Sequence, residues 1–187
     1  MTVEPIREIN KINRMYCYLK AKDPKYGLMF KFGLNTGLRI SDILPLRTGD
    51  IFNPDGSFRD YLVLNEKKTG KEKKIKMNAA LKKEILMLAP KAKNPGNTFL
   101  FRNRRTGNHI QRIQAYKVLK SAAGACGIEN FGTHSMRKTW GYWTYKASKY
   151  NIGLIMDTFN HSSPSVTLRY IGVNQDQKDK LYTMVQF

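Results

Sequence analysis

Apolar residues in the first quarter of the chain recur at the spacing of α-helices. The recurring positions are Ile9, Ile12, Tyr16 and Leu19 in residues 1–22, then Tyr26, Met29, Phe30 and Leu34. Intervals of three and four place each set on one helix face. Asp23-Pro24 supplies an N-cap and a first-turn proline for the second helix, which is expected to stop at Asn35-Thr36-Gly37. A short helix is predicted at Ser41–Leu46, where Pro45 must lie in the first turn or bend the helix.

The pattern then changes to one typical of strands, between Thr48 and Met77. Tyr61–Leu64 is a short apolar run, and Glu72–Met77 alternates so that its apolar residues share one face. The turn between them is basic and contains a glycine. A further short strand is expected near Thr98–Phe101, within a loop that spans residues 91–108. The sheet expected from this region is small, antiparallel and three-stranded.

Helical spacing returns after this sheet. Asn78 is expected to cap a helix that ends by Pro90, and a later helix is expected to end near Gly124 and Gly127. The apolar positions of these two helices and of the last one are Leu81, Ile85 and Leu88; Ile113, Tyr116, Leu119 and Ala123; and Leu181 and Met184. Three more helices are predicted from a Thr133 cap to Tyr145, at Ile152–Phe159 and at Pro164–Tyr170. This order of elements indicates an α+β domain that is mostly α.

The net charge of the chain indicates the kind of partner that it binds. Lys and Arg number 33 against 14 Asp and Glu, which gives a net charge of +19. Such an excess points to a polyanion, because side chains that neutralise phosphates release condensed counterions. Nucleic acid is the favoured partner, although charge alone leaves DNA, RNA and an anionic membrane surface open. The apolar share of 41% in 187 residues supports one folded domain and excludes a disordered basic tail.

The chain carries few signals for membranes, secretion or metals. No apolar run approaches the roughly 20 residues of a membrane span, and the first residues lack the apolar stretch of a signal peptide. Cys17 and Cys126 lie far apart in a chain with three histidines. We therefore expect reduced thiols in a cytoplasmic protein and no zinc site.

Two basic segments are candidates for phosphate contact. In Asn35–Asp42, Arg39 follows a glycine turn, and Asp42 stands one helical turn later, where it is expected to orient the guanidinium. A lone arginine at a helix start is ordinarily solvated or ion-paired. Lys68 lies in the basic turn of the predicted hairpin, whose tip can enter a groove of a duplex. The alternative for Lys68 is simple exposure to solvent.

Two further segments contain histidines at notable spacing. His134 and Arg137 share a helix face near a helix N-terminus, which favours bound phosphate; the alternative is a capping histidine and a surface arginine. Trp140 and Trp143 on that helix are expected in the core. In the block H-S-S-P-S-V-T-L-R-Y, His161 precedes Tyr170 by nine residues across a helix begun by proline, a spacing that packing does not explain.

Together these segments resemble the tyrosine recombinase (phage integrase) family, from about Leu28 to Tyr170. That family carries T-G-L-R-x-S-[DE], a hairpin lysine, H-x-x-R and G-H-[ST]-x₄-[ST]-x₂-Y in the same order. The resemblance implies a helical catalytic domain for residues 23–174, preceded by an arm and helix at 1–22 and followed by a tail at 175–187. The catalytic residues implied are Arg39, Lys68, His134, Arg137, His161 and Tyr170, with Asp42 as a supporting acid.

The resemblance also implies a reaction. Tyr170 is expected to attack a DNA phosphodiester and form a 3′-phosphotyrosyl bond, with His134 as the base and Lys68 as the acid for the leaving 5′-oxygen. Arg39, Arg137 and His161 are expected to hold the phosphate oxygens. Because the phosphodiester energy is conserved, neither ATP nor a metal cofactor is expected.

Two departures and two rival functions accompany this prediction. Asn160 stands where the family usually has glycine, and about two dozen residues precede the catalytic block. Such a short N-terminal part resembles that of the invertases of fimbrial switching, of an integrase fragment, or of a plasmid or phage variant. The rivals are a type IB topoisomerase, with a similar constellation, and a non-catalytic DNA-binding protein on the same fold. The H-S-S-P-S-V-T-L-R-Y block favours the recombinase over the topoisomerase, and the presence of all six candidate residues argues against a dead enzyme.

The resemblance implies a bacterial, phage- or plasmid-encoded protein that is associated with the nucleoid. It also implies double-stranded DNA as the partner, with a monomer in solution and a tetramer on paired sites. In the tail, Leu181, Met184 and Val185 lie at helical spacing, and so short an amphipathic helix is marginal in water without a surface to cover it. The resemblance implies that a neighbouring protomer supplies this surface. The alternative is a tail that folds back on its own domain.

Overall fold

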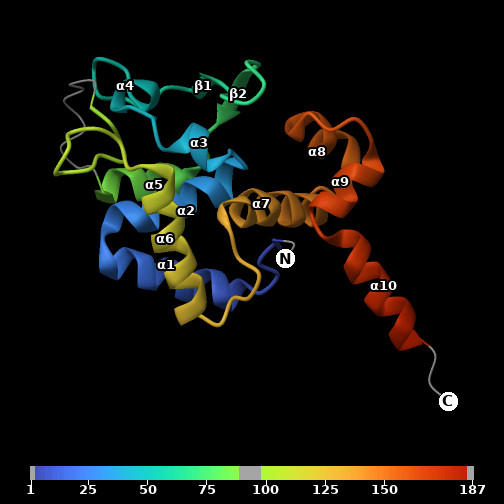
Figure 1. Ribbon diagram of the computed structural model, residues 1–187. Helices are drawn as coiled ribbons and strands as arrows, with labels where there is room; N and C mark the ends of the chain where they lie inside the picture. Colours follow the sequence, from blue (N-terminus) through green and yellow to red (C-terminus); the bar gives the residue numbers. More distant parts are fainter. Residues whose placement is uncertain (1–2, 89–97, 185–187) are drawn as a thin grey trace.

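A computed structural model describes residues 3–88 and 98–184 and consists mainly of helices around one small hairpin (Figure 1). The elements are α1 (Ile9–Lys22), α2 (Pro24–Thr36), α3 (Ile40–Ile43), α4 (Thr48–Ile51), β1 (Tyr61–Asn65), β2 (Glu72–Lys76), α5 (Ala79–Leu88), α6 (Arg112–Ala125), α7 (Thr133–Ala147), α8 (Ile152–Phe159), α9 (Pro164–Tyr170) and α10 (Val173–Met184). The expected fold, α+β and mostly α, is confirmed.

The second helix, α2, is the centre of the larger core. Its N-cap is Asp23, whose carboxylate accepts a hydrogen bond of 3.0 Å from the backbone N–H of Lys25, as the sequence predicts. At its end Gly37 adopts a left-handed conformation with φ of 64°, and a Cβ there would lie 2.5 Å from the Trp140 ring. Glycine is therefore required for both the turn and the close approach of α7.

The sheet differs from the prediction, because the described residues form two strands and not three. β1 and β2 pair antiparallel, with Leu62 opposite Ile75. The strand expected near Thr98–Phe101 is reduced to a single bridge between Phe99 and Arg47. Thr48, which was expected to begin the strand region, instead begins the helical turn α4.

Several helix boundaries also need correction. α3 ends at Ile43, so Pro45 follows the helix and does not lie in its first turn. The N-cap of α7 is Gly132, and the Ser135 hydroxyl accepts a 3.2 Å bond from its N–H; Thr133 is the first helical residue and not the cap. Asn78 caps α5 as predicted, accepting from the Leu81 N–H at 2.8 Å. The expected end of that helix at Pro90 and most of the following loop lie outside the described residues.

Some apolar residues that share a predicted helix face are exposed. Ile9 on α1 is 56% exposed, whereas Leu19 of the same predicted set is buried and Ile12 and Tyr16 pack partly buried against the core. Met15, which was not in that set, is also buried. On α6, Ile113 is 71% exposed and Tyr116 is 45% exposed. Helical spacing thus identified the helices but not every buried position.

The long helix α7 joins two core clusters. Met136 packs in the larger one against α2, and Tyr142 packs in a smaller one with Phe159 and Ile171. Trp140 and Trp143 pack against this smaller cluster, as expected. In Figure 1 the hairpin lies across from α7 and α8, and α10 runs away from the remaining helices. None of the helices in the described ranges has both the length and the apolar content that a membrane crossing requires.

Candidate active site

Two arginines approach one another from α3 and α7. Arg39 is the N-cap residue of α3, directly after the Gly37 turn, and Arg137 lies in the first half of α7 with 1% exposure. Arg137 Nη1 donates to the Gly37 carbonyl at 2.6 Å, and Nη2 donates to the Phe159 carbonyl at 3.4 Å. The guanidinium also lies 4.2 Å from the centre of the Phe159 ring. Arg137 therefore ties the glycine turn to the end of α8 and is held in one orientation.

The carboxylate that pairs with Arg39 is Glu66, next to the end of β1. Glu66 Oε1 lies 2.9 Å from Arg39 Nη1 and 3.7 Å from Arg137 Nη1, and the residue is 1% exposed. Burial raises the pKa of Glu66, whereas the Thr69 hydroxyl, Lys73 and Arg39 lower it, and the net result is a lowered pKa. Glu66 is thus a buried anion between two cations.

Asp42 was expected to orient the Arg39 guanidinium, but its hydrogen bond is to the hairpin. Its Oδ1 accepts a 3.0 Å hydrogen bond from the backbone N–H of Lys67, so this buried acid supports the hairpin turn. Two lysines fix the other side of the hairpin. Lys73 Nζ donates to the Thr158 carbonyl at 2.6 Å, and Lys71 Nζ donates to the Asn160 side chain at 3.3 Å. The hairpin is consequently attached both to α3 and to the end of α8.

The tyrosine and both histidines of the predicted site come together. Tyr170 Oη lies 3.4 Å from His134 Nδ1, and the rings of Tyr170 and His161 have centroids 5.0 Å apart. His161 Nδ1 lies 3.1 Å from the hydroxyl of Thr167, which is fully buried. Pro164 and the Ser163 cap start α9 so that Thr167 faces His161 and Tyr170 ends the helix.

The electrostatic environment favours neutral forms of these three rings. Burial lowers the pKa of His134, and Arg112, Arg137 and Arg39 lower it further. Burial also lowers the pKa of His161, and Arg137 and Arg39 lower it further. Burial raises the pKa of Tyr170, although Arg137 and Arg39 oppose this. At neutral pH His134 is therefore an unprotonated imidazole next to a protonated phenol, the state that a proton acceptor needs.

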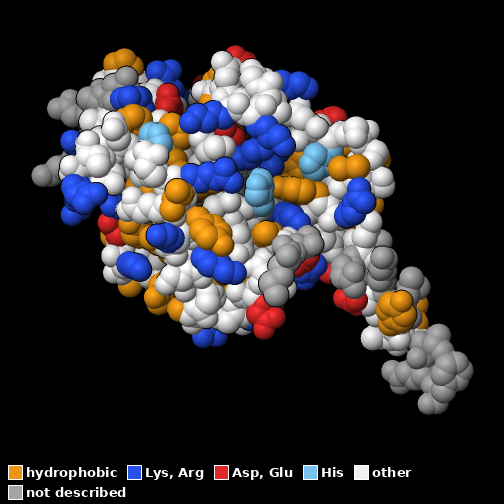
Figure 2. Space-filling view, in the orientation of Figure 1, with side chains coloured by type: hydrophobic (Ala, Val, Ile, Leu, Met, Phe, Trp, Pro, Cys, Tyr) orange, Lys and Arg blue, Asp and Glu red, His pale blue; other side chains and the backbone are white. Residues whose placement is uncertain are grey.

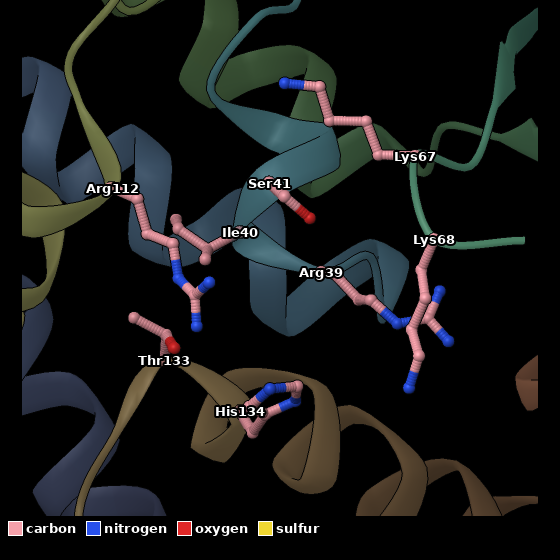
Figure 3. A pocket seen from close by; sticks show the side chains of 8 residues that line it. All are labelled: Arg39, Ile40, Ser41, Lys67, Lys68, Arg112, Thr133 and His134. Carbon is pink, nitrogen blue, oxygen red and sulfur yellow. The ribbon is translucent and has the colours of Figure 1, made fainter.

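A cleft of about 340 Å³ opens in front of these groups (Figure 3). Arg39, Lys68 and His134 line it, and Arg112 enters from the opposite side. Lys68 points toward His134, whereas Lys67 points away from it. In the space-filling view, Lys and Arg side chains gather between the hairpin and α7, beside two histidines (Figure 2). The cleft is strongly cationic and open to a polyanion.

The candidate residues thus form one constellation, assembled from segments far apart in sequence. Three members line the cleft, and Tyr170 adjoins it through His134 while His161 packs against Tyr170. Arg137 connects to Arg39 through Glu66. The prediction missed Glu66, Lys73, Arg112 and the partner role of Thr167. Thr167 occupies the second [ST] position of the last motif, which was a usable signal. Glu66 carried none, because an acid in a polar hairpin is ordinarily exposed.

The described residues also offer few donors for a metal. No group of three or more His, Cys, Asp or Glu side chains is placed to hold an ion in residues 3–88 and 98–184. Cys17 is exposed and Cys126 is buried, and both are free thiols.

Sequence comparison decides the family. Residues 5–177 match the phage integrase family. The chain belongs to this family. It is also similar to the probable integrase/recombinase YoeC of Bacillus subtilis (strain 168), with 44% identity over 180 residues, which covers 96% of this chain and 95% of that protein. The predicted membership of the tyrosine recombinase (phage integrase) family is confirmed.

Solved structures of recombinases share the fold of this phage integrase family member. XerH site-specific recombinase bound to palindromic difH substrate aligns with a TM-score of 0.68 at 17% identity, over 98% of this chain and 54% of that one. A lambda integrase tetramer bound to a Holliday junction aligns with a TM-score of 0.69 at 14% identity, over 91% and 48%. The chain therefore spans about half the length of these two structures.

Proposed function

We propose that this phage integrase family member is a site-specific DNA recombinase that cleaves and rejoins strands through a 3′-phosphotyrosyl intermediate. The observation that carries the proposal is the contact of Tyr170 Oη with His134 Nδ1 at 3.4 Å, beside a cleft lined by Arg39 and Lys68. A nucleophile, a base and cationic phosphate ligands are the parts that the reaction needs.

The first step is the attack of Tyr170 on the scissile phosphorus. The phenol proton passes to His134, whose lowered pKa leaves it able to accept the proton at neutral pH. The bond between phosphorus and the 5′-oxygen breaks as the new phosphotyrosyl bond forms. Lys68 gives a proton to the departing 5′-oxygen, which is a poor leaving group as an alkoxide.

The negative charge that develops on the non-bridging oxygens is held by Arg39, Arg137 and His161. Charge-assisted hydrogen bonds from fixed donors are worth most in such a partly buried site, and removing one donor costs on the order of 10²–10³ in rate in other enzymes. The Thr167 hydroxyl donates to the Ser163 carbonyl at 3.2 Å, so its oxygen can accept from His161 Nδ1 and hold the imidazole. Donation from Nε2 to the phosphate then requires the imidazolium form of His161, which the negative charge of the phosphate favours. Attack of a 5′-hydroxyl from a second strand reverses the step, so the reaction consumes no ATP.

Double-stranded DNA is the proposed partner. We propose that the protein binds one site as a monomer and paired sites as a tetramer. The basic face of Figure 2 and the DNA-bound recombinases of similar fold support the first part. α10 supports the second, because it runs away from its own domain and its Tyr182 and Met184 are 85% and 73% exposed. We propose that residues 175–187 dock on a neighbouring protomer.

A nicked suicide duplex tests the chemistry. A library of duplexes of random sequence, each with one nick, is incubated with wild type and with Tyr170→Phe. Wild type should give a protein–DNA adduct that survives denaturation, and Tyr170→Phe should give none while binding DNA nearly as well. An adduct in the Phe variant would assign the nucleophile to another of the ten tyrosines. An adduct at every nicked sequence, together with relaxation of supercoils, would favour a topoisomerase.

A further inference from the structure

Glu66 is a buried acid in the midst of the cations of the proposed site. We propose that Glu66 is a positioning residue, which holds Arg39 and Arg137 from behind so that their guanidinium groups face the scissile phosphate. The proposal rests on the proposed function, because it assigns Glu66 a part in the same cleavage step. It adds a residue to the constellation that the sequence motifs did not contain.

Both oxygens of the Glu66 carboxylate are engaged. Oε1 lies 2.9 Å from Arg39 Nη1, 3.5 Å from Lys73 Nζ and 3.7 Å from Arg137 Nη1. Oε2 accepts from the Thr69 hydroxyl at 2.9 Å and from the Asn160 amide at 3.4 Å. A carboxylate with this many partners has a fixed orientation, and it fixes the groups that pair with it.

The place of Glu66 is behind the arginines and outside the cleft proposed for the phosphate. That cleft is lined by Arg39, Lys68 and His134 and not by Glu66. Glu66 lines instead a separate hollow of about 520 Å³ between the hairpin, α7 and α8. Substrate therefore reaches Arg39 from one side while Glu66 contacts it from the other, and the two need not compete for the same edge of the guanidinium.

The charge of Glu66 also offsets repulsion between its partners. Arg137, Arg39 and Lys73 are like charges in a partly dehydrated cluster: burial lowers the pKa of Lys73, and Arg137 lowers it further. Burial likewise lowers the pKa of Arg137, with Arg39 as the next cause. Without an anion among them, the two arginines would move apart and lose the orientation that cleavage requires.

This role predicts effects of opposite sign on binding and on chemistry. Glu66→Gln keeps the shape of the side chain but removes its negative charge, so the net charge rises by one unit and duplex DNA should bind equally well or more tightly. The rate of adduct formation at saturating protein should fall by about tenfold or more, which is less than the loss on deleting a phosphate ligand outright. A residue that served only to stabilise the fold would weaken binding and chemistry together.

Glu72→Gln is the matched control. Glu72 is an exposed acid on the same hairpin and lines the same hollow, and its substitution changes the net charge by the same amount. Single-turnover adduct formation on the suicide duplex and duplex affinity at several salt concentrations are measured for wild type and both variants. Glu72→Gln should cleave at the wild-type rate. Equal rates for Glu66→Gln and Glu72→Gln would overturn the positioning role, whereas failure of wild type to form an adduct would overturn the proposed function itself.

A second variant covers the case in which Glu66→Gln does not fold. Glu66→Asp keeps the charge in the cluster but withdraws the carboxylate by one methylene, so it retains charge neutralisation and loses reach. Positioning predicts slow cleavage with normal DNA affinity and a thermal unfolding curve close to wild type. Normal cleavage by Glu66→Asp would mean that a nearby negative charge is sufficient and that Glu66 does not position the arginines.

Discussion

His134 lies where every nearby charge opposes its protonation. Burial and three arginines lower its pKa below the ordinary histidine value of 6.5, and its Nδ1 faces the phenol of Tyr170. If His134 is the base, cleavage fails only when it becomes protonated, and the lowered pKa moves that point to more acidic pH. The acid limb of kcat/KM for adduct formation, which reports the free protein, should therefore lie below pH 6.5.

The measurement is the pH profile of adduct formation at low DNA concentration. His134→Gln should cleave more slowly and should lose the acid limb, because no imidazole remains to be protonated at that position. Thermal unfolding at each pH serves as a control for loss of structure. An acid limb at or above pH 6.5, or one that persists in His134→Gln, would argue that another group accepts the proton.

Lys68 is the residue whose role depends most on side-chain direction. Five other lysines crowd the two strands and their turn, at positions 67, 71, 73, 74 and 76. Lys67 and Lys68 both line the cleft, yet Lys68 points toward His134 and Lys67 points away from it (Figure 3). Lys68→Ala should cut an ordinary duplex slowly, because the departing 5′-oxygen lacks a proton donor. It should recover on a duplex whose bridging 5′-oxygen is sulfur, since a thiolate leaves without a proton.

Lys67→Ala is the matched control for this test. It removes the same charge from the adjacent position and should cleave both duplexes at nearly the wild-type rate. Sulfur rescue of Lys67→Ala, or none for Lys68→Ala, would move the acid to another hairpin residue. Lys73 is a poorer candidate for the acid because its ammonium is already bound to the Thr158 carbonyl and Glu66.

At the scale of elements, the arm before α1 holds the segment that carries the tyrosine. Arg7 Nε donates to Asp176 on α10 at 2.7 Å, and Nη2 donates to the Gly172 carbonyl at 3.2 Å. The Ile6 N–H donates to the Thr139 hydroxyl on α7 at 2.8 Å. The N-terminal arm therefore lies beside the α9–α10 junction, two residues after Tyr170.

A double-mutant cycle measures this connection. Arg7→Ala and Asp176→Ala should each destabilise the protein modestly, and their coupling energy in urea unfolding should be about 0.5–1 kcal/mol, as expected for a pair about one-third exposed. Each single variant should also cleave more slowly than the exposed control Lys22→Ala. A coupling energy of zero would mean that the arm lies on α10 without holding it.

The elements that the sequence predicted best are those with local start and stop signals. α8 and α9 have the predicted boundaries, because Asn151 and Ser163 cap them and Asn160 can adopt the left-handed conformation that ends α8, with φ of 55°. The prediction of a third strand was wrong, because among the described residues Phe99 forms a single bridge, with Arg47, which is 52 positions away. Pairing at such a distance leaves no trace in local spacing, and neither does the exposure of Ile113.

At the scale of the whole molecule, the site depends on how closely α7 approaches α2. A Cβ on Gly33 would lie 2.8 Å from Met136, so only glycine allows this contact. That contact and the Gly37 turn bring Arg137 beside Arg39 across about 100 residues of chain. Motif order predicted which residues meet. The buried charges that hold them, above all Glu66, depend on packing of the hairpin against α8 and could not be predicted from spacing.

In the proposed function, the tail is the part of the molecule that docks on another protomer. Beyond Asp176, α10 leaves the domain with Tyr182 and Met184 exposed, and a short helix with an uncovered apolar face gains stability by docking. Deletion of residues 175–187 should spare affinity for a single site and weaken both cooperative assembly on paired sites and recombination. Gel-shift titration of one-site and two-site duplexes measures this.

The deletion also removes Asp176, which pairs with Arg7, so a loss of recombination could arise within one protomer. The double variant Tyr182→Ala, Met184→Ala separates the two causes, because it keeps Asp176 and removes only exposed apolar side chains. If the tail docks in trans, the double variant should lose cooperative two-site binding as the deletion does, while suicide-duplex cleavage stays at the wild-type rate or rises because Tyr170 is less restrained. Wild-type cooperativity in the double variant, together with lost cleavage in the deletion, would place the function of the tail within its own domain.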